Sequence, residues 1–290
     1  MLRISKLSFP GLGIGNFDVN SVALTVFGIE IAWYALLITT GMICAVAYTV
    51  FRAKKIGVTF DDVLDFALFA IPIGILGARL YFVLTKLDEY DSLGEVLNIR
   101  NGGLAIYGGI IAGTITVLTV SYFKKISFLA IGDCCTPGII LAQAIGRWGN
   151  FMNGEAFGAE TKIFIRMGVN NVLTGHSERF VHPTFLYESL WNVLGFVLIN
   201  IFYKHKKYDG QILLLVFGWY GLGRMFIEGL RADSLYSSIF GIEFRTSQVL
   251  AALIFTVCTA LLIYFAVKKT QKELFVKVLP EPKAKKKKIT

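Results

Sequence analysis

Long apolar stretches follow one another along this chain, with short polar segments between them. Residues 31–51, 102–123 and 246–267 contain no Asp, Glu, Lys or Arg over 21, 22 and 22 positions. An apolar run of about 18 residues or more is long enough to cross a bilayer as a helix. The pattern therefore predicts an integral membrane protein.

Four further apolar runs are each interrupted by one or two charged residues, which brings the expected number of spans to seven. We expect an all-α integral membrane protein with one polytopic membrane domain over 1–268 and a basic tail over 269–290. A small extracytoplasmic cap is expected over 156–183. The expected spans lie near residues 22–51, 63–84, 102–123, 126–151, 184–202, 211–229 and 246–267.

The distribution of Lys and Arg predicts the orientation, since cytoplasmic loops carry an excess of both. One set of alternate segments, ending in the C-terminal tail, carries 17 basic residues, whereas the opposite set is longer and carries nine. We therefore expect the N-terminus outside and the C-terminus in the cytoplasm. With this orientation the protein lies in a cell membrane with a polar site on its outer face.

Composition adds little evidence for other classes of partner. The net charge of +9 is explained by the Lys-rich tail acting as an anchor for anionic lipid head groups, so no nucleic-acid partner is expected. All four cysteines fall within spans and none has metal-ligand spacing, so we expect buried thiols and no metal bound by them. We expect a monomer.

Several polar stretches converge on the outer side of the membrane in this topology. Glycines and aromatic residues at such positions are usually packing contacts and interfacial anchors, and a single Arg usually reaches to the head groups. The convergence nevertheless indicates one site. The stretches begin at Trp33 and Tyr34, at Arg79, and at residues 101–109, 146–158, 182–188 and 221–231.

The stretch GRWGNFMNGEAFG, residues 146–158, is the strongest candidate for that site. Arg147 and Asn150 share a helical face, and Asn153 and Glu155 are expected past the helix end. Each of these polar groups would be costly to leave unpaired in hydrocarbon. They must bind one another, water or a polar ligand.

A second charged stripe lies at the end of the sixth span. Arg224, Glu228 and Arg231 are spaced i, i+4 and i+7. We expect Arg224 and Glu228 to pair, which would leave Arg231 free to face a ligand. Guanidinium groups match phosphate oxygens, so a phospholipid head group is the expected ligand. The residues alone indicate no reaction.

The chain resembles the bacterial phosphatidylglycerol–prolipoprotein diacylglyceryl transferases. The family signature G-R-x-G-N-F-x-N-x-E-x-x-G is met at every fixed position of residues 146–158. The resemblance continues through Trp33–Tyr34, residues 77–79, the glycine pairs around Tyr107, residues 182–188 and residues 224–233. It implies transfer of a diacylglyceryl group from phosphatidylglycerol to the lipobox cysteine of a preprolipoprotein in the bacterial cytoplasmic membrane. No metal or cofactor is implied.

The resemblance also implies roles for individual residues. Arg147 and Arg231 would clamp the phosphate, and Asn150, Asn153 and Glu155 would orient head-group hydroxyls or the arginines. The expected catalytic set is Arg147, Arg231, Glu155, Asn150 and Tyr107. The expected substrate-binding set is Tyr34, Arg79, Asn153, Gly158, His182, Tyr187 and Glu228.

One position departs from the family. Many members carry His where this chain has Tyr107, and that His is a candidate general base. A phenol with a pKa near 10 is a poor base at neutral pH. Either the base lies elsewhere, with Glu155 and His182 as candidates, or the field of the arginines is the main aid to thiol deprotonation. The sequence does not decide between these.

Two other classes of function are weighed against the transferase. A phospholipid or anion transporter, or a flippase, would place charges through the depth of the bundle or show repeated halves with broken spans. Neither feature is visible. A non-catalytic membrane assembly factor would not need the complete Arg–Asn–Asn–Glu–Gly signature.

Overall fold

The computed structural model describes residues 4–90, 92–98, 102–171, 178–232, 236–239 and 242–277. The chain divides into two compact units. The first comprises residues 1–48 and 132–273, and the second comprises 49–131 and 274–290. Each unit is described by itself.

Long helices dominate the described chain, as the apolar runs predict. Six of them are long and apolar enough to cross a membrane, which makes this a multi-pass membrane protein. They are α1 (Trp33–Ala53), α2 (Phe60–Thr85), α4 (Ile106–Lys124), α5 (Phe128–Asn153), α6 (Thr184–Phe202) and α8 (Thr246–Val267). Helix α7 (Gln211–Glu228) coincides with the sixth expected span but is not among these six, so the total of seven crossings stays a prediction.

The expectation that the first span begins near residue 22 is wrong. Residues 22–32 form a hairpin of β3 (Val22–Val26) and β4 (Ile29–Ala32), and α1 begins at Trp33. The turn at Phe27 and Gly28 has positive φ at both residues, as a tight two-residue hairpin requires. The β-branched residues on both sides favour strands.

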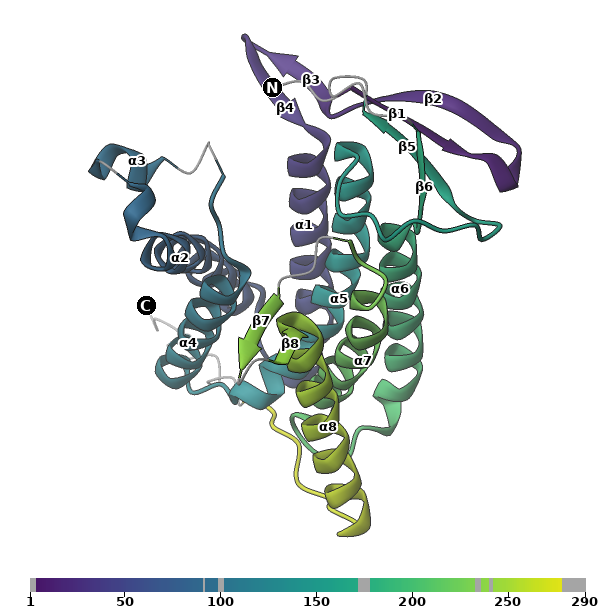
Figure 1. The fold of residues 1–290 in the computed structure, drawn as a ribbon. Coiled ribbons are helices and arrows are strands. Elements are labelled where there is room, and N and C mark those ends of the chain that lie inside the picture. Colours follow the sequence, from purple (N-terminus) through teal and green to yellow (C-terminus); the bar gives the residue numbers. More distant parts are fainter. Residues whose placement is uncertain are drawn as a thin grey trace, which may run out of the picture. The chain divides into compact units, whose positions relative to one another are not determined.

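The fold is also not purely helical, because a four-stranded antiparallel sheet in the first unit joins the N-terminus to the expected cap. Its order is β2-β1-β5-β6. Leu7 and Val169 are paired across it and belong to its buried face, which packs on Phe185 of α6 and Phe151 of α5. Figure 1 shows this sheet beside the ends of α5 and α6. The strands are β1 (Ile4–Phe9), β2 (Ile14–Asn20), β5 (Met167–Asn171) and β6 (Arg179–Val181).

The remaining elements are short. A hairpin of β7 (Tyr236–Ile239) and β8 (Ile242–Arg245) leads into α8. A one-turn helix, α3 (Leu93–Leu97), follows α2. Single 3-10 turns occupy Pro10–Leu12, Lys54–Ile56, Leu87–Glu89 and Tyr203–His205. Part of the expected cap (172–177) and most of the expected tail (278–290) lie outside the described residues.

Glycines set the helix packing in both units. In the second unit, a Cβ on Gly77 of α2 would lie 2.8 Å from the Gly108 carbonyl oxygen of α4. In the first unit, a Cβ on Gly149 of α5 would lie 2.6 Å from Cδ2 of Tyr34 on α1. These close approaches are the packing that small residues allow between membrane helices.

A buried carboxylate joins α5 to the start of α7. Asp133 has no exposed surface and accepts hydrogen bonds from the backbone N–H groups of Gly210 and Leu213, both at 2.8 Å. It also pairs with Lys206 at 2.9 Å. Burial acts to lower the pKa of Lys206, but the charges of Asp133 and Asp209 outweigh it and raise that pKa. Asp133 therefore caps α7, the helix that carries Arg224 and Glu228.

We expect Asp133→Ala to lower the free energy of unfolding by about 3 kcal/mol, since it leaves a buried Lys and a helix N-terminus with fewer partners. Thermal unfolding in detergent measures this. Asp209→Ala is the matched control, because it removes one partner of Lys206 and leaves Asp133 in place. Equal destabilisation by the two variants would contradict the capping role.

Candidate anion and lipid head-group site

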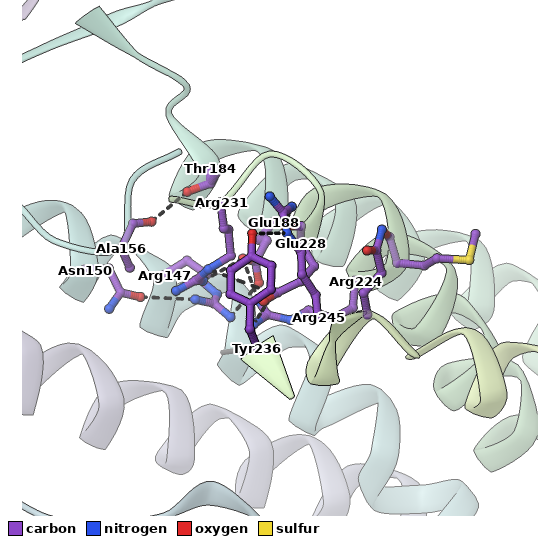
Figure 2. A network of polar contacts seen from close by, with 12 residues as sticks. Arg147, Asn150, Ala156, Thr184, Glu188, Arg224, Glu228, Arg231, Tyr236 and Arg245 are labelled. Carbon is purple, nitrogen blue, oxygen red and sulfur yellow. Dashed lines mark hydrogen bonds and ion pairs between the residues drawn. The ribbon is translucent and has the colours of Figure 1, made fainter. Parts of the chain in front are cut away.

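The polar cluster of the first unit is built by the end of α5, the start of α6 and the end of α7. Figure 2 shows their side chains turned toward one another. Arginines from α5 and from α7 and its extension point at carboxylates on α6 and α7. Three segments that lie far apart in the sequence therefore contribute to one cluster.

Glu188 of α6 is the centre of this cluster. The residue is 5% exposed, and its carboxylate pairs with three guanidinium groups. The distances are 2.5 Å to Arg147, 3.1 Å to Arg224 and 3.4 Å to Arg231. Sequence analysis did not place Glu188 among the site residues. The available signal was a single carboxylate inside an apolar run, which is a functional-site hypothesis by default.

Glu228 is the second carboxylate and is almost fully buried. Its pairing with Arg224, at 2.6 Å, confirms the predicted i, i+4 pair. The expectation that Arg231 is free of protein partners is wrong. Arg231 lies 3.4 Å from Glu188 and 4.0 Å from Glu228. The reason is tertiary, since the closer of these two carboxylates belongs to α6, a different helix from the one that Arg231 follows.

Arg245 is a further residue that sequence analysis missed. Its guanidinium donates to the Glu228 backbone carbonyl at 2.6 Å and to the Tyr236 hydroxyl at 3.0 Å. Arg245 directly precedes α8, and an Arg at such a position usually serves as an interfacial anchor. Here it ties the β7–β8 hairpin to the end of α7.

The amides at the end of α5 connect Arg147 to a third carboxylate. Arg147 donates to the Asn150 side-chain oxygen at 3.4 Å, which confirms that the two share a helical face. Asn150 and Asn153 donate to one Glu155 oxygen at 3.4 and 2.9 Å. Asn153 is still the last residue of α5, so only Glu155 lies past the helix end.

Gly158 is located where three segments of backbone cross. Its N–H donates to the His182 carbonyl at 2.9 Å, and the next N–H, of Ala159, donates to the Leu230 carbonyl at 2.7 Å. A Cβ at Gly158 would lie 2.6 Å from the His182 Cβ and 2.7 Å from the Leu230 oxygen. Only glycine fits there, so Gly158 allows the loop after α5 to approach Arg231.

Three further expected contact residues are His182, Tyr187 and Tyr34. The His182 ring lies 3.3 Å from the Tyr187 hydroxyl. Burial lowers the pKa of His182, so its ring is neutral at pH 7. Tyr34 packs against Gly149, next to Asn150 in α5.

Arg79 and Tyr107 belong to the second unit. Five hydrogen bonds of 2.7–3.2 Å run from the Arg79 guanidinium to backbone carbonyls, which matches its five N–H groups. This geometry supports positioning of residues 95–98 and 102–103, and a substrate contact for Arg79 stays a prediction. Tyr107 lies at the start of α4, 6.5 Å from the Tyr81 ring.

The cluster retains positive charge after its internal pairs are counted. Among the described residues it contains four arginines and three carboxylates. They are Arg147, Arg224, Arg231, Arg245, Glu155, Glu188 and Glu228. This excess suits an anion, and guanidinium groups favour phosphate. No group of three His, Cys, Asp or Glu side chains able to hold a metal is found in the described part of the chain.

Comparison with known proteins identifies the family. The family model described as prolipoprotein diacylglyceryl transferase matches residues 21–264. The chain belongs to this family. It is similar to the phosphatidylglycerol–prolipoprotein diacylglyceryl transferase of Clostridioides difficile, with 44% identity over 75% of this chain and 85% of the relative.

Two further relatives of the same name cover more of the chain. That of Listeria welshimeri is 40% identical over 87% of this chain and 92% of its own length. That of Enterococcus faecalis is 41% identical over 85% of this chain and 90% of its own length. The family model, over residues 21–264, includes α5, α6 and α7, the helices that build the cluster.

We expect Glu188→Gln to lower the free energy of unfolding by about 2–4 kcal/mol, because three arginines lose a shared carboxylate. Thermal unfolding of the purified protein measures the change. Glu160→Gln, the same substitution at an exposed position, is the control. A shift in Glu188→Gln no larger than that of the control would show that Glu188 does not hold the cluster together.

Proposed function

We propose that this chain transfers the sn-1,2-diacylglyceryl group of phosphatidylglycerol to the lipobox cysteine of preprolipoproteins, the first step of lipoprotein maturation. The observation that carries this proposal is the cluster of arginines around Glu188 in a chain of this family. Relatives 40–44% identical over most of the chain bear the name of this enzyme.

The proposed reaction places defined demands on the site. The cysteine sulfur forms a bond to the terminal glycerol carbon of the diacylglyceryl group, and the bond from that carbon to the phosphate oxygen breaks. Glycerol phosphate leaves as an anion, and the thiol proton passes to a base or to the phosphate. Guanidinium groups fixed near the leaving phosphate stabilise its developing charge.

Arg147 and Arg231 are the proposed phosphate clamp. Arg147 keeps 23% of its side chain exposed, against 15% for Arg224 and 10% for Arg231. It is therefore the most accessible of the three arginines that share Glu188. Asn150 and Asn153 hold Glu155, which orients the head group or accepts the thiol proton.

The remaining expected contacts are proposals of the same kind. His182, neutral because burial lowers its pKa, is the alternative base. Tyr34, Tyr187, Gly158 and Glu228 are proposed substrate contacts, and Arg79 is proposed as a further one. The substrates are phosphatidylglycerol and membrane-tethered peptides, and the protein acts as a monomer without metal or cofactor.

The proposed topology has seven spans, with α7 as the sixth to cross. The N-terminus lies outside the bacterial cytoplasmic membrane and the basic tail inside, as the distribution of Lys and Arg predicts. The cluster then lies at the outer face, where phospholipid phosphates are available.

A transfer assay tests the function directly. The purified protein is incubated with phosphatidylglycerol and a lipobox peptide, and the peptide mass is measured. We expect a diacylglyceryl increment on the Cys peptide and none on a matched Cys→Ser peptide. No increment, with folded protein that binds phosphatidylglycerol, would overturn the transferase and favour the lipid transporter.

In the same assay we expect Arg147→Ala and Arg231→Ala to lose a hundredfold or more in rate, of the order seen when one oxyanion donor is removed. Arg179→Ala, an exposed Arg on β6, is the control and should retain wild-type activity. Wild-type rates in both clamp variants would remove the clamp from the mechanism.

We expect Tyr107→Phe to keep most of its activity. A general base contributes roughly a hundredfold or more, so loss of a base would be obvious in the rate. Comparison of kcat with wild type, at matched amounts of folded protein, measures this. A fall in kcat of that size in Tyr107→Phe would show that the Tyr107 hydroxyl takes part in catalysis.

A further inference from the structure

Helices α6 and α7 are joined by a reciprocal pair of tryptophans. The indole N–H of Trp191 on α6 donates to the backbone carbonyl of Trp219 on α7 at 3.0 Å, and the indole N–H of Trp219 donates to the Trp191 carbonyl at 3.0 Å. The two rings stack with centroids 4.2 Å apart and planes at 15°. We call this arrangement the tryptophan clasp.

Each ring lies in a notch made by a glycine of the opposite helix. A Cβ on Gly195 of α6 would lie 2.2 Å from the Trp219 indole nitrogen. A Cβ on Gly223 of α7 would lie 2.2 Å from the Trp191 indole nitrogen. Both helices therefore carry the same pattern, a Trp followed four residues later by a Gly. The clasp fits only one axial register of the two helices.

The clasp lies next to the charged cluster in both helices. Trp191 follows Glu188 by three residues, so the two share a face of α6. Gly223 directly precedes Arg224, which pairs with Glu188 at 3.1 Å. The register set by the clasp is therefore the register that brings Glu188 to the arginines.

Trp219 packs on one side against a buried apolar cluster that includes Ile199 and Val216. The ring borders a cavity of about 290 Å³ that is lined mainly by apolar side chains of α6, α7 and α8. In hydrocarbon an unpaired indole N–H is costly, so each indole is held to one carbonyl. The two hydrogen bonds therefore fix the axial register of α6 and α7 more closely than apolar contacts beside a cavity would.

We propose that Trp191 and Trp219 are positioning residues for the anion site, which hold α6 and α7 in the register that assembles the Glu188 cluster. They act through Glu188 and Arg224 and do not touch the substrate themselves. The kinetic test of this proposal rests on the proposed function, because it measures transfer. The binding test does not, because it measures only the affinity for phosphatidylglycerol.

The test uses the full-length protein and four variants. Trp191→Phe and Trp219→Phe keep an aromatic ring and remove the indole N–H. Gly195→Ala places a methyl group against Trp219. Gly218→Ala, on α7, is the matched control, because its Cβ would meet only the Cys258 Cβ at 3.5 Å.

Four readouts are taken at equal amounts of folded protein: circular dichroism, the dissociation constant for phosphatidylglycerol in nanodiscs, and kcat and KM for transfer. Stacked indoles give an exciton couplet, and the chain has only four tryptophans. We expect the first three variants to lose the couplet. Their kcat/KM for phosphatidylglycerol should fall roughly ten- to a hundredfold, as small misplacement of a site produces. KM for the peptide and all values for Gly218→Ala should stay unchanged.

A double variant sharpens the result. If Gly195→Ala acts only by displacing the Trp219 ring, it should have no further effect in a Trp219→Ala background. If Gly195→Ala lowers kcat/KM further in that background, Gly195 does not act through the Trp219 ring. The role of Gly195 in seating that ring would then be rejected.

The outcomes separate the clasp from the enzyme activity. Loss of the couplet with unchanged lipid binding and kcat/KM would overturn the positioning role. A wild-type protein that transfers nothing would overturn the proposed function. The clasp is then judged by lipid binding alone. Weaker binding in the variants supports it, whereas unchanged binding, or no binding by wild type, overturns it.

Discussion

The arrangement of the site depends on one carboxylate shared by three guanidinium groups. Glu188 is almost fully buried, and its attraction to Arg147, Arg224 and Arg231 is strong because little water screens it. Arg147 comes from α5 and Arg224 from α7, and Arg231 lies just after the end of α7. Removing Glu188 would leave like charges facing one another, so the helix ends and the site form together.

The surrounding backbone keeps this end of the first unit compact. Gly158 allows the loop after α5 to cross beside His182 and Leu230 without steric conflict. The four-stranded sheet packs its apolar face on Phe151 and Phe185 of the same helix ends. Charge pairing inside the cluster and apolar packing beside it therefore act on the same segments, which limits the freedom of the arginines before any ligand arrives.

The helices could be predicted from sequence because their signal is local. The apolar runs gave each long helix to within a few residues at most ends, and i, i+4 spacing correctly paired Arg224 with Glu228. The role of Glu188 could not be predicted, since it depends on three partners 36 to 43 residues away in one direction or the other. The sheet was missed for a similar reason, because β1 pairs with β5 across more than 150 residues. The β3–β4 hairpin was missed because its apolar residues continue directly into α1.

The internal carboxylates bear on both binding and release of an anion. Guanidinium groups already held by Glu188 and Glu228 need little rearrangement when a phosphate arrives, which is the preorganisation that stabilises developing charge. The same carboxylates offset most of the positive charge. On the proposed function the leaving glycerol phosphate carries more charge than the phosphodiester it comes from. A site with a large cationic excess would hold that product tightly. The pairing within the cluster therefore favours stabilisation of charge as it develops and also allows the product anion to leave.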